Sequence, residues 1–300
     1  MLINSNNYPL VSVIMNCYNG ETYLFDSIKS ILDQTYKNFE IIFWDNQSKD
    51  NSAIIFKSFK DKRLKYYYAK KHTTLYKARN LAIQKSKGKF IAFLDTDDIW
   101  VKDKLNLQIK KFINKKIGLV YANYYTLNQA TGFKAIAYKK ELPEGVICRN
   151  LLKDYFLGIG TVIVRKEIFM KKKNFDENFN IIGDFDFFTR ISKSTYFAKI
   201  QDPLLIYRIH ENSFSNKNYQ MYINEFKLWL KKQKLFNENS IFFVKQKVVY
   251  MEAVLDILNK RYISALKNIL KIVSNKKKIK LIFFIFIPNF IFIKLKSNFS

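Results

Sequence analysis

The stretch 89-KFIAFLDTDDIW-100 sets three carboxylates directly behind an apolar run. Residues 90–94 are all apolar, as expected for a buried strand, and Asp95, Asp97 and Asp98 follow within four positions. Like charges this close repel one another, so one carboxyl group should take up a proton unless a cation compensates. The turn therefore raises the question of which positive charge it holds.

Strand and helix patterns alternate before this turn. Apolar, β-rich runs predict four strands, at residues 10–18, 39–45, 64–69 and 89–95. Helical spacing of apolar residues predicts three helices between them, at residues 21–34, 51–59 and 75–85. Such alternation is typical of an α/β fold with parallel strands and helices on both faces of the sheet. Ligands of such sheets bind beyond the carboxyl ends of the strands.

Polar turns follow three of these strands, at residues 16–19, 45–48 and 95–98. Mg²⁺ and similar hard cations bind one or two carboxylates together with phosphate oxygens. The 95–98 turn therefore fits a divalent cation that bridges to a diphosphate. The alternative is a structural turn in which Asp98 caps a helix running from Ile99 to Phe112.

Two other classes of nucleotide site are not supported. No GxGxxG follows the first strand, and the chain contains no GxxxxGK[ST]. These are the fingerprints of dinucleotide-binding and P-loop sites. The Gly-rich, Arg-containing loop expected of a nucleotidyltransferase is also missing from the first turn, which carries Gly20 alone.

Composition indicates which partners and which cellular compartment the protein has. The 300 residues carry a net charge of +27, but the lysines are scattered rather than gathered in one stripe. Scattered charge predicts no specific nucleic-acid partner and agrees with a bias toward AT-rich codons. Cys17 and Cys148 lie far apart without a CxxC partner, and the first ten residues do not resemble a signal peptide, which together indicate a reducing cytosol.

The C-terminal part reads differently from the rest. Helical patterns dominate from about residue 221, and residues 281–293 (LIFFIFIPNFIFI) are almost wholly apolar between lysine-rich flanks. Thirteen helical residues would reach about 20 Å against about 30 Å of bilayer hydrocarbon, too short to span. We expect an in-plane contact with the inner face of a membrane. The alternative is a terminal element packed on the protein's own core.

Four blocks of the sequence resemble the family-2 glycosyltransferases with a GT-A fold. The first block is VSVIMNCYNGETYLFDSIKSILDQTYKNFEIIFWDNQSKDNS (11–52), and the second is ARNLAIQKSKGKFIAFLDTDD (78–98). GDFDFFTRI (183–191) and YRIHENSFS (207–215) resemble the third and fourth. The blocks occur in the family's order and cover about residues 9–215. The resemblance implies a Rossmann-like nucleotide-diphospho-sugar transferase domain.

The resemblance also implies a role for each matching residue. Residues that would bind the nucleotide are Asn16, Tyr18, Asp45, Asn46, Arg79 and Asp95. Residues that would meet Mn²⁺ or Mg²⁺ and the diphosphate are Asp95, Asp97 and His210. Asp184 falls where the family has its catalytic base, with Asp186 as the next candidate. Each has a structural alternative: packing alone for Tyr18, a helix cap for Asp184, and a structural hydrogen bond for His210.

Two positions depart from the family pattern. The second turn usually has two carboxylates, of which the second contacts uracil, and here that position is Asn46. An amide both donates and accepts, so the choice among uracil, thymine and cytosine stays open. The third block usually reads Glu-Asp, and here it reads Gly183-Asp184.

We therefore expect a metal-dependent, inverting glycosyltransferase of the hexosyl or N-acetylhexosaminyl class. Its donor would be a nucleoside-diphosphate sugar, a UDP-sugar first among them. Its acceptor would be a saccharide or lipid-linked saccharide in polysaccharide, lipopolysaccharide or glycoprotein-glycan synthesis. Predicted parts are a lead (1–8), the transferase domain (9–215), a helical extension (216–275) and a membrane-contacting tail (276–300), peripheral on the cytoplasmic side. The rival is a non-catalytic nucleotide- or saccharide-binding module, which would not need Asp184 as a base.

Overall fold

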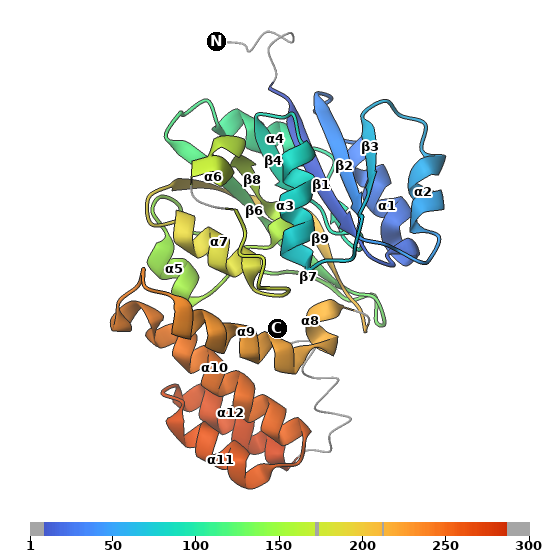
Figure 1. Ribbon diagram of the computed structural model, residues 1–300. Helices are drawn as coiled ribbons and strands as arrows, with labels where there is room; N and C mark the ends of the chain where they lie inside the picture. Colours follow the sequence, from blue (N-terminus) through green and yellow to red (C-terminus); the bar gives the residue numbers. More distant parts are fainter. Residues whose placement is uncertain (1–8, 172–173, 212, 287–300) are drawn as a thin grey trace. The chain divides into compact units, whose positions relative to one another are not determined.

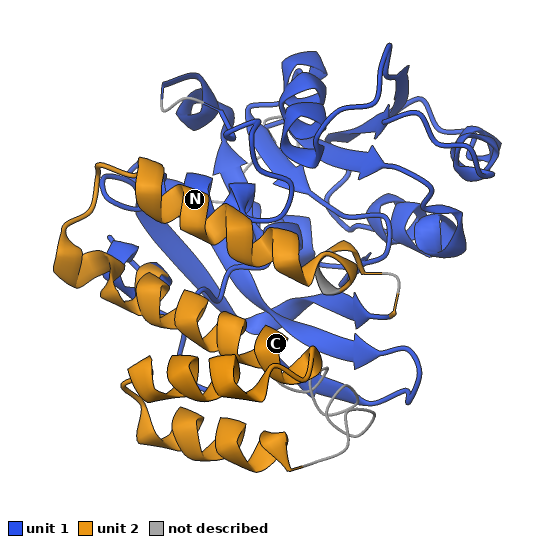
Figure 2. Ribbon diagram, turned by 60° about the horizontal axis from the view of Figure 1, so that its bottom comes forward, with its two compact units in different colours: residues 1–151, 155–210 blue, residues 152–154, 211–300 orange. Residues whose placement is uncertain are grey.

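The computed structural model describes residues 9–171, 174–211 and 213–286 (Figure 1). The chain divides into two compact units, coloured separately in Figure 2. The first holds the chain up to residue 151 together with residues 155–210, and the second holds residues 152–154 and the chain from 211 onward. All the predicted site residues lie in the first unit.

The first unit is built on a mixed sheet of nine strands. Four of them, in the order β3-β2-β1-β4, run parallel: β1 (Val11–Cys17), β2 (Phe39–Asp45), β3 (Leu64–Tyr68) and β4 (Phe90–Phe93). Three helices connect them: α1 (Glu21–Leu32), α2 (Ser52–Ser58) and α3 (Leu75–Lys85). The predicted alternation of strand and helix is confirmed in this half.

The other half of the sheet contains antiparallel pairs. Its strands are β5 (Ile99–Trp100), β6 (Ile117–Asn128), β7 (Lys134–Ile136), β8 (Ile163–Arg165) and β9 (Tyr196–Ile209). β8 is antiparallel to β4 and β6, whereas β9 runs parallel to β6. β5 pairs antiparallel with β9, so residues 99–100 are extended and the helix α4 covers only Lys104–Lys111. The alternative of a helix from Ile99 capped by Asp98 is therefore wrong.

Side chains of β1 alternate between the two faces of the sheet. Val11, Val13, Met15 and Cys17 pack into one core with α1 residues such as Leu24 and Ile28. Ile14 and Asn16 therefore point to the opposite face, where α3 lies in front of the strands in Figure 1. This arrangement brings the polar face of α3 to the carboxyl ends of β1 and β4.

The second unit is helical. Its helices are α8 (Phe214–Lys217), α9 (Tyr219–Lys232), α10 (Glu238–Leu258), α11 (Tyr262–Lys271) and α12 (Asn275–Ile285). Ala253 and Ile257 of α10 share a core with Ile269 of α11 and Leu281 of α12. The apolar stretch 281–293 begins in α12, and its residues 287–293 lie outside the described part. Within the described residues, no helix has the length and apolar character needed to cross a membrane.

Gln34 fastens the end of α1 to the segment behind the acidic turn. Its buried Nε2 donates to the carbonyls of Ser30 and Val101 at 3.1 and 2.9 Å, and its Oε1 accepts from the backbone N–H of Leu105 at 3.0 Å. A Gln34→Met variant keeps the volume and loses these three bonds. At about 1 kcal/mol each, we expect the free energy of unfolding to fall by about 3 kcal/mol.

Chemical denaturation measures this loss. Asp33→Ala is the matched control, because it removes an exposed ion pair with Lys29 worth at most about 1 kcal/mol. Equal losses in the two variants would contradict the role given to Gln34.

Candidate active site

The two half-buried aspartates of the 95–98 turn, Asp95 and Asp97, each lie beside a basic side chain. Arg79 Nη2, on α3, donates to Asp95 Oδ1 at 2.5 Å. His210 Nε2, just past β9, lies 3.0 Å from Asp97 Oδ2. The side chains of Asp95 and Asp97 are 37% and 33% exposed, so both can still face a ligand.

Asp98 is buried and behaves differently. Its Oδ1 accepts a hydrogen bond from the backbone N–H of Arg208 at 3.1 Å. Burial raises the pKa of Asp98 well above its ordinary value, and the charges of Asp97 and Asp95 raise it further. Among the three aspartates, Asp98 is therefore the one whose carboxyl group the fold disposes most strongly toward the protonated form.

Arg208 supplies unpaired donors beside the turn. Its side chain is buried, its Nη2 pairs with Asp26 Oδ2 at 2.9 Å, and its guanidinium stacks 4.6 Å over the Tyr23 ring. Its Nε and Nη1 have no hydrogen-bond partner in the described part of the chain. A buried N–H without an acceptor costs free energy, and the guanidinium places positive charge beside the acidic turn.

The donor set of the turn suits a divalent cation held partly by a ligand. Within residues 9–171, 174–211 and 213–286, no three His, Cys, Asp or Glu side chains form a ready metal cluster. Such a cluster is not needed where phosphate oxygens complete the shell of Mg²⁺ or Mn²⁺. Asp95 and Asp97 present carboxylate oxygens, and His210 a ring nitrogen, at one edge of the sheet.

Asp184 lies in the first turn of α7 (Gly183–Ile191) and accepts hydrogen bonds from two tyrosines. Tyr76 Oη donates to its Oδ1 at 2.8 Å, and Tyr155 Oη donates to its Oδ2 at 3.0 Å. Burial raises the pKa of Asp184, although these hydrogen bonds and the charge of Arg79 oppose the rise. A carboxyl group whose pKa is raised toward neutrality is suited to accept a proton.

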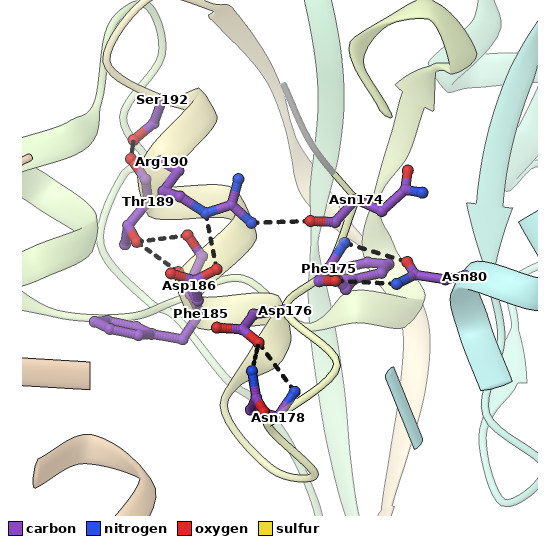
Figure 3. A network of polar contacts seen from close by, with 10 residues as sticks. All are labelled: Asn80, Asn174, Phe175, Asp176, Asn178, Phe185, Asp186, Thr189, Arg190 and Ser192. Atoms are coloured by element: carbon purple, nitrogen blue, oxygen red, sulfur yellow. Dashed lines mark hydrogen bonds and ion pairs between the residues drawn. The ribbon is translucent and has the colours of Figure 1, made fainter. Parts of the chain in front are cut away.

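Asp186, the other acidic residue of α7, is held in an ion pair. Arg190 Nε donates to Asp186 Oδ2 at 2.8 Å, and Arg190 Nη2 donates to the carbonyl of Asn174 at 3.1 Å (Figure 3). The same figure shows Asn80 bonded to both backbone polar atoms of Phe175, at 3.0 and 3.2 Å. Asp186 thus stabilises α7, while Asn80 fastens the segment before α7 to α3.

Asp45 and Asn46 have their side-chain polar atoms engaged within the fold. Asp45 is buried, its Oδ1 accepts from the backbone N–H of Ser48, and its Oδ2 accepts from Tyr66 Oη, both at 2.7 Å. Asn46 Nδ2 donates to the carbonyl of Thr73 at 2.9 Å, and its Oδ1 accepts from the Thr73 N–H and hydroxyl at 3.2 Å. Both side chains hold the β2 turn in place.

Tyr18 and Asn16 stand at the end of β1. The Tyr18 ring is 52% exposed and lies 4.4 Å from the ring of His72. Both amide atoms of Asn16 are buried without a hydrogen-bond partner in the described part of the chain. A Cβ on Gly20 would lie 2.7 Å from Thr96 Oγ1, so the first turn packs directly against the acidic turn.

Comparison with known protein families decides to which family the chain belongs. The profile of Glycosyl transferase family 2 matches residues 12–196. The chain belongs to this family. It is therefore a glycosyltransferase with a GT-A fold that uses a nucleotide-sugar donor.

Relatives and solved structures agree with this assignment. A beta-1,3-glucosyltransferase of Escherichia coli, named WfgD, is 32% identical over 70% of this chain and 81% of its own length. The Bacillus subtilis protein TuaG, a putative teichuronic acid biosynthesis glycosyltransferase, is 31% identical over 54% of this chain and 65% of its own.

Two solved structures share the fold. Staphylococcus aureus TarS residues 1–349, in complex with UDP, gives a TM-score of 0.58 at 17% identity over 86% of this chain and 88% of its own. The mannosyltransferase PcManGT of Pyrobaculum calidifontis, in complex with GDP-Man and Mn²⁺, gives 0.60 at 14% identity over 88% and 75%. At this identity the likeness concerns the fold.

The departure of this glycosyltransferase at Gly183 has a steric reason. A Cβ at position 183 would lie 2.4 Å from the Tyr76 ring. A glutamate before Asp184 therefore cannot coexist with Tyr76 in its present place. Tyr76 instead supplies a hydrogen bond to Asp184.

Four residues of the site were not predicted from the sequence: His72, Tyr76, Tyr155 and Arg208. Tyr76 precedes Arg79 by three residues on α3, so helical spacing could have placed it beside Arg79. His72 is one of only two histidines and follows a predicted strand. No sequence signal marks Tyr155.

The raised pKa of Asp184 predicts a pH-dependent cost to stability. A carboxyl group with a raised folded pKa stabilises the fold below its unfolded pKa, near 3.9, and loses that stabilisation as the pH rises through the folded value. Asp184→Asn mimics the protonated form. Its melting temperature should exceed that of the wild type at pH 7 and converge with it near pH 4.

Asp186→Asn is the matched control for this thermal melt. It breaks the ion pair with Arg190, so its melting temperature should fall below that of the wild type at pH 7. An Asp184→Asn protein less stable than wild type at pH 7 would contradict the raised pKa.

Proposed function

We propose that this glycosyltransferase is metal-dependent and inverting, and that it moves a hexosyl or N-acetylhexosaminyl group from a UDP-sugar to a hydroxyl of a lipid-linked saccharide. One observation carries the proposal. Arg79 bonds Asp95 of the acidic turn, and its charge also acts on the pKa of Asp184. The candidate base and the candidate diphosphate site therefore adjoin the same guanidinium.

The reaction is a single displacement. The acceptor oxygen forms a bond to the anomeric carbon as the bond from that carbon to the diphosphate oxygen breaks, which inverts the configuration. Asp184 takes the proton of the acceptor hydroxyl as general base. Tyr76 and Tyr155 hold its two oxygens and orient it.

Asp95, Asp97 and His210 would hold Mn²⁺ or Mg²⁺ at the acidic turn. When bound, such a cation stabilises the negative charge that develops on the leaving nucleoside diphosphate. Arg79 orients Asp95 through its hydrogen bond, and the buried guanidinium of Arg208 adds positive charge beside the turn.

The names of relatives support the donor and acceptor classes. The Escherichia coli relative is named for UDP-Glc as donor and alpha-D-GlcNAc-diphosphoundecaprenol as acceptor. The Bacillus subtilis relative is named for teichuronic acid biosynthesis, and TarS was solved with UDP. These names favour a role in cell-surface polysaccharide or lipopolysaccharide assembly. A non-catalytic binding module is disfavoured because it has no use for a carboxylate with a raised pKa beside the donor site.

A membrane-bound acceptor agrees with the surface of the second unit. Ile279, Ile282 and Phe283 of α12 are exposed on the side of the helix opposite the buried Leu281 and Phe284. On α11, exposed apolar side chains recur at helical spacing at Ile263, Leu266 and Leu270. Helix α12 also carries the lysines at positions 276, 277, 278 and 280. Apolar side chains beside lysines are typical of helices that lie in an anionic membrane surface, and we propose a peripheral position on the cytoplasmic side.

Transfer assays with point variants test the chemistry. UDP-glucose and a synthetic GlcNAc-diphospholipid serve as substrates. Asp184→Asn should bind UDP as the wild type does and transfer about 10²–10⁴-fold more slowly, because the base is lost. Asp97→Asn should lose most Mn²⁺-dependent turnover while its thermal stability stays near that of the wild type.

Asp186→Asn is the control that locates the base. An Asp184→Asn enzyme with wild-type turnover would refute the proposal for that residue, and loss of turnover in a folded Asp186→Asn protein would move the base there. An active Asp97→Asn enzyme would contradict the metal site.

Vesicle sedimentation tests the membrane surface. Ile279→Ser combined with Phe283→Ser should release most of the protein from vesicles containing anionic phosphatidylglycerol. Ile113→Ser with Phe133→Ser is the matched control, because these side chains are similarly exposed in the first unit. Equal release by both pairs, or unchanged binding by the first, would contradict the assignment, as would full membrane binding of a chain that ends at Asn275.

A further inference from the structure

The side chain expected to read the nucleobase, Asn46, already has partners within the fold. Both polar atoms of Asn46 bond Thr73, as described above. Gln47 is used in the same way: its Oε1 accepts from the backbone N–H of His72 at 3.0 Å, and its Nε2 donates to the carbonyl of Lys70 at 3.1 Å. The turn after β2 and the loop after β3 are thus clamped together. This use of both side chains within the fold points to a further group as the reader of the base.

His72 stands on this clamped loop with one ring nitrogen committed. Its Nδ1 lies 2.9 Å from the backbone carbonyl of Asn46. A carbonyl oxygen only accepts, so Nδ1 carries the hydrogen. In the neutral imidazole the other nitrogen, Nε2, is then an acceptor.

His72 and Tyr18 together form an exposed aromatic pair. Their ring centroids are 4.4 Å apart, with the planes tilted by 59°. Tyr18 follows β1, and His72 follows β3 in the loop clamped to the end of β2, so the pair stands at the carboxyl edge of the parallel strands. This edge is where ligands bind in such sheets, and exposed aromatic rings stack well on nucleobases.

We infer that His72 is the residue that selects the nucleobase of the donor, with Tyr18 as the stacking surface. Nε2 accepts a hydrogen bond from the N3–H of uracil. Thymine carries the same N3–H, whereas N3 of cytosine is itself an acceptor and would face Nε2 without a hydrogen. The site therefore takes UDP and dTDP and rejects CDP. This inference rests on the proposed function, because it requires a nucleoside diphosphate at this edge.

Titration calorimetry with UDP, dTDP and CDP in the presence of Mn²⁺ tests the inference. Wild-type protein should bind UDP and dTDP about tenfold or more tightly than CDP, since an unmet hydrogen bond costs about 1–3 kcal/mol. His72→Phe keeps an aromatic ring and removes the acceptor. Its affinity for UDP should fall about tenfold while its affinity for CDP stays the same, so the preference disappears.

Two further variants keep the test decisive. His72→Gln presents an amide that donates as well as accepts, so it should admit CDP beside UDP. Lys71→Ala, on the same loop, should leave the ratio of UDP to CDP affinity unchanged. An unchanged ratio of UDP to CDP affinity in His72→Phe would overturn the inference. If both affinities fall equally, His72 has a structural role. Wild-type protein that binds no nucleoside diphosphate would instead overturn the proposed function itself.

Discussion

Repulsion among the three aspartates behind β4 is the constraint on which the site depends. Each carboxyl group has a different environment: Asp95 bonds Arg79, Asp97 lies beside His210, and Asp98 is buried with a raised pKa. The two partner side chains come from α3 and from the end of β9, far apart in the sequence. These contacts require that the elements meet at the end of β4, which is also where a cation would compensate the charge of the carboxylates and of a diphosphate.

Helix α3 connects the acidic turn to the candidate base. One helix turn presents Tyr76 to Asp184, Arg79 to Asp95 and Asn80 to the segment before α7. The candidate base is thereby tied to the acidic turn through a single rigid element. Gly183 permits the connection, because any side chain there would collide with Tyr76. An otherwise unusual position in the third block is thus the steric partner of a tyrosine on α3.

The parallel half of the fold was predictable because its strands are long and apolar and its helices show clear periodicity. The other half was not. Ile99–Trp100 and Ile163–Arg165 are too short to show a pattern, and the longer β6 and β9 pair with register shifts that break a regular alternation. Family resemblance placed Asp95, Asp97, Asp184 and His210 at positions where the structure brings polar groups together. Resemblance identifies a residue but not which of its atoms are free. Only the structure shows that the Asn46 amide is hydrogen-bonded to Thr73 and that the His72 side chain is exposed.

The central claim is that the acidic turn binds a nucleoside diphosphate through a divalent cation. A thermal-shift measurement with UDP, with and without Mn²⁺, tests it most directly. Ligand at 100 times its dissociation constant adds about 2.7 kcal/mol to stability, which is readily seen as a rise of a few degrees in melting temperature. The account predicts a rise with UDP and Mn²⁺ together and little change with either alone. No rise under any of these conditions, or an equal rise without metal, would contradict it.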